Sequence, residues 1–346
     1  MDRVLRVAEA GRDVTALVGR RLVALVAVLC GLAVIVFVLQ AVIPSDPARA
    51  VVGASASPEA VAAKEHELGY DKPLPAQFAD YLGRTVSGDL QSSLRTRNPV
   101  ADDLMTFAPA TLELALSASV LAALLGIALA LALAGGGRTA KLLRLSLVAG
   151  ASVPGFLVAL LAILLFYSVL GILPASGRVT DTLVIPDGPT KLLLVDALLA
   201  GDPGVFFSAL GHLVLPSLTL AIVPALAIAR TLATTLEQVM REDYVRTARS
   251  KGLRERSIIV RHGLRNAAGP ALTMGGLQFG LLLGGIVVVE QIFSWPGLGL
   301  YLNQSIAFSD FPAITGTTLM LGTAYVVVNF LVDLAQAAAD PRIRTI

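Results

Sequence analysis

The side chains of this 346-residue chain that could do chemistry are few and widely spaced. The three histidines, His66, His212 and His262, lie in separate stretches, and the single cysteine, Cys30, lies in an apolar run, so no intrachain disulfide can form. The sequence shows no His or Cys cluster with metal-ligand spacing, no phosphate-binding glycine loop and no serine elbow. It therefore predicts a chain that is not an enzyme, with no catalytic residue, no metal and no cofactor of its own.

Three acidic residues, Glu113, Glu290 and Asp333, fall within long apolar runs. A charge in hydrocarbon costs about 3 kcal/mol on insertion scales, so such residues are candidates for a transport path. All three stand near an end of their run, where a headgroup or a polar partner is within reach, and a packing role stays open beside a role in the path. Because no acid lies clearly at mid-membrane depth, the sequence argues against transport energised by this chain alone.

The richest polar stretch is 241–265, REDYVRTARSKGLRERSIIVRHGLR, which carries eight Lys or Arg against three acids between two apolar runs. A charged insert of this kind must lie in water, and its positive charge predicts the cytoplasmic side. Its letters predict a short helix ended by Gly252 and a second helical start at Leu253. A helix–glycine–helix elbow without a catalytic group is a docking surface; a tether that binds anionic lipid is the alternative.

Composition indicates what surrounds this stretch. Apolar residues make up 55% of the chain and charged residues 15%, where roughly 25% is usual for soluble domains. Mean hydropathy is +0.76. The net charge of +2 is too small to suggest nucleic acid as a partner. The sequence therefore predicts an all-α, multi-pass membrane protein in contact with lipid.

Six apolar runs are predicted to cross the membrane: 22–43, 112–134, 145–173, 213–229, 271–293 and 313–336. The first is too long for a cleaved signal peptide and is expected to be retained. With residues 1–21 and 337–346 inside, the predicted inner segments carry 19 Lys or Arg and the outer ones 8. This bias places both termini in the cytoplasm.

The segment 44–110 is polar and long enough for a small periplasmic subdomain, although an exposed connector is the simpler alternative. Ser57, Pro58 and Glu59 have the residue types of a helix start, and Gly69 would end that helix. A second amphipathic piece follows, with Phe78, Tyr81 and Leu82 on one face.

Two further features concern the membrane region. Residues 174–211 form a second outer loop, in which an interfacial helix is expected to break at Gly201–Gly204. Pro154 and Gly155 lie within the third run, where a proline removes a backbone hydrogen bond and bends a helix. Such a bend could shape a pathway wall or serve ordinary packing.

Three motifs in order carry a family resemblance. Residues 243–253, DYVRTARSKGL, match the usual DYVRTARAKGL wording of the coupling loop in the peptide/nickel branch of ATP-binding-cassette importer permeases at all but one position. The generic Glu-Ala-Ala form of this loop is kept only at Ala248 and Gly252. Residues 287–302 resemble the ETIFxxPGLG turn of the branch, and 333–344 its DPRIR ending, with Gln336 in place of the usual aromatic. Residues 68–90 also resemble the B-type subunits.

This resemblance implies a type I importer permease fold of six transmembrane helices, with a transmembrane domain at 111–336 and a cytoplasmic coupling loop at 235–268. It implies an ATP-driven importer, with di- or oligopeptides expected as substrates. The expected partners are a second homologous permease, two ATPase subunits that bind ATP and Mg, and a periplasmic or lipid-anchored binding protein. A stand-alone secondary carrier or channel is the alternative.

The resemblance also assigns candidate site residues. The coupling set is Asp243, Tyr244, Arg246, Thr247, Ala248, Arg249, Lys251, Gly252, Leu253 and Arg256. Small residues at Ala248 and Gly252 would let the helix seat in a partner's groove. Leu253, Ile258 and Ile259 would be apolar anchors, and the basic residues would meet acids at the groove rim. The candidate pathway or gate set is Pro154, Gly155, Glu290 and Asp333.

Overall fold

The structure is a computed structural model that describes residues 2–42, 49, 52, 56–69, 71–135, 137, 140, 143 and 153–339, with the backbone alone at 2–18, 20–22, 68, 333 and 335–339. The start of the third predicted run and most of the predicted tail at 337–346 lie outside these residues. Over the described ranges the chain is helical and forms no strand beyond an isolated bridge between Ser92 and Pro99.

Five helices among the described residues are long and apolar enough to cross a membrane. They correspond to five of the six predicted runs and are α1 (Asp2–Val42), α5 (Val100–Ala134), α9 (Pro203–Val239), α12 (Leu264–Ile292) and α14 (Phe311–Ala339). The described part of the remaining run forms the short helix α7 (Gly155–Ala162) and a π-helical turn, η1 (Ile163–Val169). The total of six spans therefore stays a prediction.

The helices extend past the apolar runs that predict them. Helix α5 begins at Val100, so the last residues of the predicted subdomain at 44–110 belong to a long helix. Helix α8 (Leu193–Leu199) is followed by Gly201 at a φ of 67°, which confirms the predicted break. The residues after the break begin the long helix α9, because the Asp202 carboxylate accepts a hydrogen bond from Val205 N at 3.0 Å and caps the helix there.

The chain divides into two compact units, and the first comprises Met1–Ala108 and Leu300–Val326. The predicted helix start is confirmed there: Ser57 accepts a hydrogen bond from Ala60 N at the start of α3 (Pro58–Leu68). Gly69 ends that helix at a φ of 74°. Helix α4 (Leu74–Ser87) turns Phe78 and Tyr81 toward Phe37 of α1, with ring centroids 5.1 and 5.7 Å apart, so its aromatic face is a packing surface.

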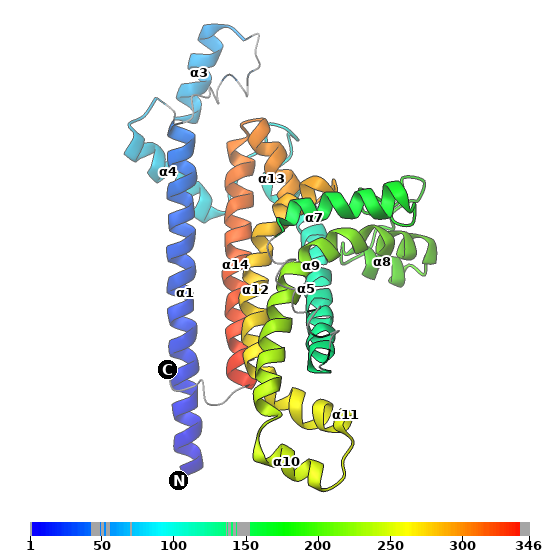
Figure 1. Ribbon diagram of the computed structural model, residues 1–346. Helices are drawn as coiled ribbons and strands as arrows, with labels where there is room; N and C mark the ends of the chain where they lie inside the picture. The colour runs from blue at the N-terminus through cyan, green and yellow to red at the C-terminus, as the bar shows by residue number, and fades with distance from the viewer. Residues whose placement is uncertain are drawn as a thin grey trace. The chain divides into compact units, whose positions relative to one another are not determined.

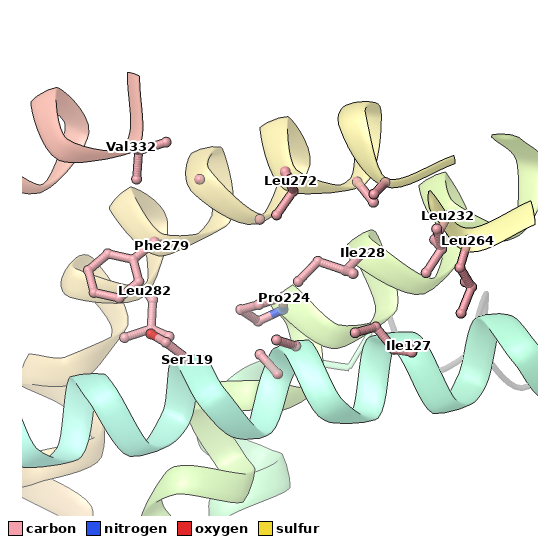
Figure 2. Close-up of a pocket in the computed structure, with 16 residues that line it drawn as sticks. Ser119, Ile127, Pro224, Ile228, Leu232, Leu264, Leu272, Phe279, Leu282 and Val332 are labelled. Atoms are coloured by element: carbon pink, nitrogen blue, oxygen red, sulfur yellow. The ribbon is translucent and has the colours of Figure 1, made fainter. Parts of the chain in front are cut away.

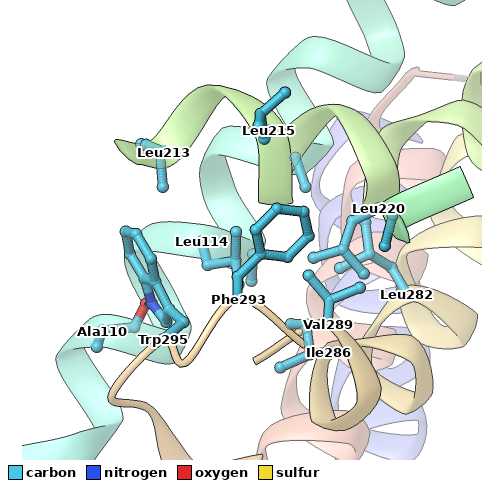
Figure 3. Packing of buried hydrophobic residues seen from close by; sticks show 13 residues of the cluster. Ala110, Leu114, Leu213, Leu215, Leu220, Leu282, Ile286, Val289, Phe293 and Trp295 are labelled. Carbon is cyan, nitrogen blue, oxygen red and sulfur yellow. The ribbon is translucent and has the colours of Figure 1, made fainter. Parts of the chain in front are cut away.

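The second unit comprises Pro109–Gly299 and Val327–Ile346. Within it α9 lies along α12, and the chain between them forms α10 (Asp243–Ser250), α11 (Glu255–Ile258) and the π-helical turn η2 (Ile259–Gly263), as Figure 1 shows. Helices α7 and α8 lie toward the other end of α9. A core cluster that includes Leu114, Leu215, Phe293 and Trp295 fills the space between α5, α9 and the end of α12 (Figure 3).

Candidate functional site

The stretch predicted to be an elbow is one, and its shape has a local cause. Helix α10 ends at Ser250, and Gly252 takes a φ of 75° that L side chains rarely adopt. Its N–H donates to Arg249 O at 2.9 Å, and Leu253 N donates to Ala248 O at 3.4 Å, which closes the end of the helix. Helix α11 then starts at Glu255, two residues beyond the predicted start at Leu253. We call residues 241–265 the elbow.

The elbow has a small apolar core of its own. Val245, Ala248 and Ile258 are buried together, and Met240 at the end of α9 packs against them. Met240 also packs in a second cluster formed by α5, α9 and α12. At Gly263 a Cβ would lie 2.7 Å from Leu236 Cδ1, so the second arm of the elbow meets α9 closely there. These contacts tie the elbow to the ends of α9 and α12.

An ion pair joins the two arms across the bend. Arg249 Nη2 donates to Glu255 Oε1 at 2.7 Å and Nε donates to Oε2 at 3.1 Å, while Nη1 lies 3.4 Å from Met240 O. The hydrogen bond to Glu255 raises the pKa of the Arg249 guanidinium. Both side chains stay roughly half exposed, so solvent screens the pair and its geometry matters more than its strength.

The structure gathers all ten predicted coupling residues in the elbow and divides them by the way they face. Ala248 packs inward, and Arg249 is paired within the chain. Two apolar side chains face out: Tyr244 is 43% exposed and Leu253 is 45% exposed. The other exposed members are Asp243, Arg246, Thr247, Lys251, Gly252 and Arg256.

Two of the expected anchors are corrected. Ile258 is fully buried in the elbow core, and Ile259 packs against the cluster at the ends of α9 and α12. Both side chains pack within this chain, because a short amphipathic helix buries its apolar face against the nearest apolar surface. Ala248 was also expected to seat against a partner, but it is buried in the core of the elbow. Leu253 keeps its expected exposure.

The four predicted pathway residues lie at the start of α7, in α12 and in α14. Pro154 precedes α7 and Gly155 is its first residue, both exposed, so the proline caps a helix start. Asp333 lies in α14, and its side chain is outside the described residues. Glu290, near the end of α12, is fully buried: it accepts hydrogen bonds from Thr111 Oγ1 and from Gly299 N, each at 2.7 Å.

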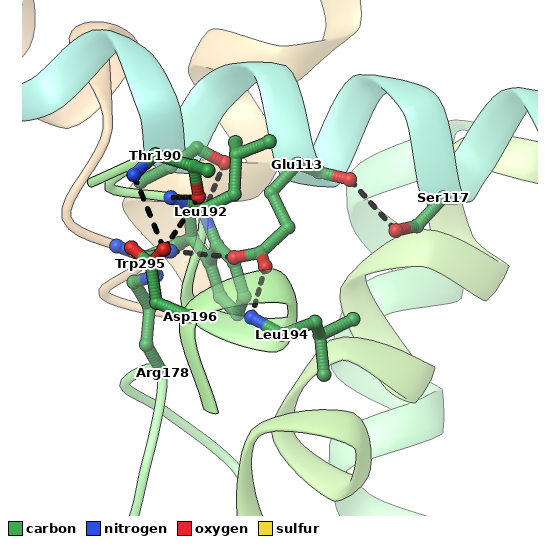
Figure 4. Close-up of polar contacts among 9 residues, drawn as sticks. Glu113, Ser117, Arg178, Thr190, Leu192, Leu194, Asp196 and Trp295 are labelled. Carbon is green, nitrogen blue, oxygen red and sulfur yellow. Dashed lines mark hydrogen bonds and ion pairs between the residues drawn. The ribbon is translucent and has the colours of Figure 1, made fainter. Parts of the chain in front are cut away.

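Glu113 is also bound within the protein (Figure 4). Its carboxylate pairs with Arg178 Nη2 at 2.5 Å and accepts a hydrogen bond from Leu194 N at 2.8 Å. The Arg178 guanidinium lies over the Trp295 ring, 5.6 Å from its centroid. The loop between α7 and α9 is thereby attached to α5, so Glu113 has the packing role that the sequence left open.

Between the elbow and this polar region lies an apolar cavity of about 440 Å³, lined by α5, α9, α12 and one turn of α14 (Figure 2). Ile127, Pro224, Leu272 and Phe279 are among its walls. The hydroxyl of Ser119, which also lines it, donates to Ala115 O at 2.6 Å and so is used by its own helix. Among the described residues, no group of three His, Cys, Asp or Glu side chains could hold a metal ion.

Apolar helices of spanning length, with an exposed and internally braced elbow between two of them, define a multi-pass membrane protein. The chain belongs to the family described as binding-protein-dependent transport system inner membrane component, which matches residues 122–345. The N-terminal part of the same class of membrane component matches residues 14–115. The fold is that of a type I permease of this family, as the resemblance implied.

Similar proteins match this chain over nearly its whole length. The chain is 44% identical to a probable D,D-dipeptide transport system permease protein of Escherichia coli, over 92% of this chain and 94% of the relative. It is 40% identical to a di/tripeptide transport system permease protein of Pseudomonas aeruginosa, over 94% and 98% of the two chains. A glutathione transport system permease protein of Escherichia coli is 36% identical, over 94% and 97%. The relatives are transport subunits of one branch, as the motifs predict.

Several residues that shape the site were not found by sequence reasoning. Thr111 and Arg178, the partners of the two buried acids, lie 179 and 65 positions away from Glu290 and Glu113. No local pattern connects such pairs. Glu255 could have been found, since an acid six positions after Arg249 lies just beyond the glycine that turns the chain back.

Proposed function

We propose that this chain is a permease subunit of an ATP-driven importer for di- or oligopeptides. In this proposal the ATPase subunits bind the elbow and displace it when they change conformation. The observation that carries the coupling role is the elbow itself: an exposed surface, braced by its own core and ion pair, at the shared end of α9 and α12. A rigid body attached in this way passes a displacement of its partner to both helices.

The proposal includes an assembly. A second homologous permease completes the translocation pathway, two ATPase subunits hold ATP and Mg, and a periplasmic or lipid-anchored binding protein delivers the solute. The elbow and both termini face the cytoplasm, as the excess of basic residues at that side supports. Residues 44–110 face the periplasm in this arrangement. The names of the relatives, which are permeases for dipeptides, di- and tripeptides and glutathione, support the substrate class.

The surface that meets the ATPase is smaller than the whole elbow. Tyr244 and Leu253 are its apolar contacts, because they are the members of the coupling set whose large apolar side chains are exposed. Arg246, Lys251 and Arg256 surround them and suit an acidic rim. Arg249 contributes to docking indirectly, because its guanidinium is bound to Glu255 and holds the bend of the elbow.

Co-purification tests this proposal. The tagged chain is isolated in mild detergent and its partners are identified by mass spectrometry. We expect an ATPase and a second permease with the wild type, and loss of the ATPase with Gly252→Trp, because Trp cannot adopt the φ of 75° without strain. Leu253→Glu leaves the bend intact and is expected to lose the ATPase as well.

Gly252→Asn is the matched control, because Asn tolerates the left-handed conformation and a Cβ at this position meets nothing within 4 Å. It should keep the ATPase. Recovery of the chain alone, as a stable monomer or homodimer in several detergents, would favour a stand-alone carrier or channel.

A further inference from the structure

The elbow and Glu290 lie at opposite ends of one helical run. Helix α11, the turn η2 and helix α12 follow one another without a break from Glu255 to Ile292, 38 residues in all. The run is not one straight axis: α11 lies across the end of α12 in Figure 1, and the π-helical turn η2 and Pro270 interrupt its regular geometry. Its first residue is the partner of Arg249 in the elbow, and Glu290 is two residues from its last. The elbow is therefore connected to Glu290 through α12.

At that end Glu290 is part of a closed hydrogen-bonded group, which we call the latch: Thr111, Glu290, Leu298 and Gly299. Leu298 N donates to Thr111 Oγ1 at 2.7 Å, so the one hydroxyl hydrogen of Thr111 is free to go to Glu290 Oε1, also at 2.7 Å. Gly299 N donates to Glu290 Oε2. In both of these bonds the carboxylate accepts.

The latch places the start of α13 (Leu298–Ala307) against both α5 and α12. The Leu298 and Gly299 amides are first-turn groups that have no partner within their own helix, and the latch supplies an acceptor to each. The negative carboxylate also lies at the helix end that favours it. Beside the latch, Trp295 Nε1 donates to Ala110 O at 2.9 Å and fixes the preceding turn to α5.

The glycines of the PGLG sequence leave room for this group. A Cβ at Gly297 would lie 2.2 Å from Glu290 Oε1 and 2.5 Å from Thr111 Oγ1. A Cβ at Gly299 would lie 2.5 Å from Val287 Cα, which is backbone and cannot turn aside. The motif that resembled a family turn is therefore built around one buried carboxylate.

We propose that the latch is the point at which a displacement of the elbow-bearing run is passed to α5 and α13, so that Glu290 and Thr111 are positioning residues of transport. This inference rests on the proposed function. It follows from the connection: a helix passes motion to what is bound to its far end, and there the bonds of the latch join α12 to α5 and to the start of α13. An open latch leaves the elbow and its partners as they are and interrupts the transfer.

The test compares Thr111→Val with Thr111→Ser in the complete purified transporter, reconstituted in lipid with its binding protein and a labelled dipeptide. Valine keeps the shape and removes the hydroxyl, whereas serine keeps the hydroxyl. We expect Thr111→Val to hydrolyse about tenfold more ATP per dipeptide imported, the size of effect that loss of a hydrogen bond to a charged group can produce, with unchanged co-purification of the ATPase. Thr111→Ser should stay close to the wild type.

Amide hydrogen exchange at Leu298 and Gly299 reads the latch without any transport. Faster exchange in Thr111→Val than in Thr111→Ser is expected. Equal exchange in the two variants would overturn the latch, and faster exchange with an unchanged ATP-to-dipeptide ratio would overturn its part in transmission. A wild-type complex that imports no dipeptide with ATP would instead refute the proposed function, and the exchange result would still report on the latch.

Discussion

The two ends of the run from Glu255 to Ile292 each hold one carboxylate in place, and they do so in opposite ways. At the elbow Glu255 pairs with Arg249 in the open, with both side chains roughly half exposed. At the latch Glu290 is fully buried and accepts hydrogen bonds from a hydroxyl and a backbone amide. The first arrangement is screened by water, and the second is not.

This difference has a physical consequence for each end. An exposed ion pair contributes little to stability, so a partner can approach the elbow without a large penalty. A buried carboxylate that loses a donor keeps its full cost of desolvation. The open state of the latch is therefore strongly disfavoured. The ion pair at the elbow can therefore exchange with solvent, and the hydrogen bonds at the latch cannot.

Closing space at the latch is expected to have the largest effect of any change at the two ends. Gly299→Ala puts a Cβ 2.5 Å from the backbone of α12, and we expect a loss of about 2 kcal/mol or more in stability, as for other overpacked sites. The measurement is thermal unfolding of the purified chain in detergent. Gly284→Ala is the control. Gly284 lies in α12, and a Cβ there would meet nothing within 4 Å, so this change should be neutral or slightly stabilising. Similar losses in both variants would refute the close packing.

The next prediction separates the fold of the elbow from its surface. Ile258→Ala empties the buried core of the elbow, and we expect about 2 kcal/mol or more of local destabilisation, with faster tryptic cleavage at Arg254 and Arg256. Leu253→Ala removes an exposed side chain, and we expect unchanged cleavage with lower recovery of the ATPase. Faster cleavage in Leu253→Ala would place that side chain in the core of the elbow instead.

Much of this architecture could be predicted from the sequence, because its signals are local. Gly252 ends a helix since the chain needs a positive φ there, and Ser57 and Gly69 act on groups within four residues of themselves. Hydropathy found the membrane runs but not their full helices. Helix α5 starts at Val100 and α9 at Pro203, since a helix can continue past the hydrocarbon wherever its first turn is capped.

The site could be predicted only in part for a different reason. The positions of the coupling residues were fixed by their spacing around Gly252, but the directions in which Ala248 and Ile258 point depend on Met240, at the end of another helix. Glu290 stood out as an acid in an apolar run, yet its role depends on Thr111, which only the folded chain brings near. A residue type at a given depth suggests a function, and its partners decide it.

The smallest expected effect is at the exposed ion pair. We predict that the double-mutant coupling energy between Arg249→Ala and Glu255→Ala, measured by thermal unfolding, is well below that between Thr111→Val and Glu290→Gln and falls as salt is added. The pair formed by Arg246 and Asp243, at 3.3 Å and more exposed still, is the matched control and should show no coupling. If Arg249 and Glu255 were coupled as strongly as Thr111 and Glu290, and without dependence on salt, the pair would be shielded from water, and the contrast between the two ends would be refuted.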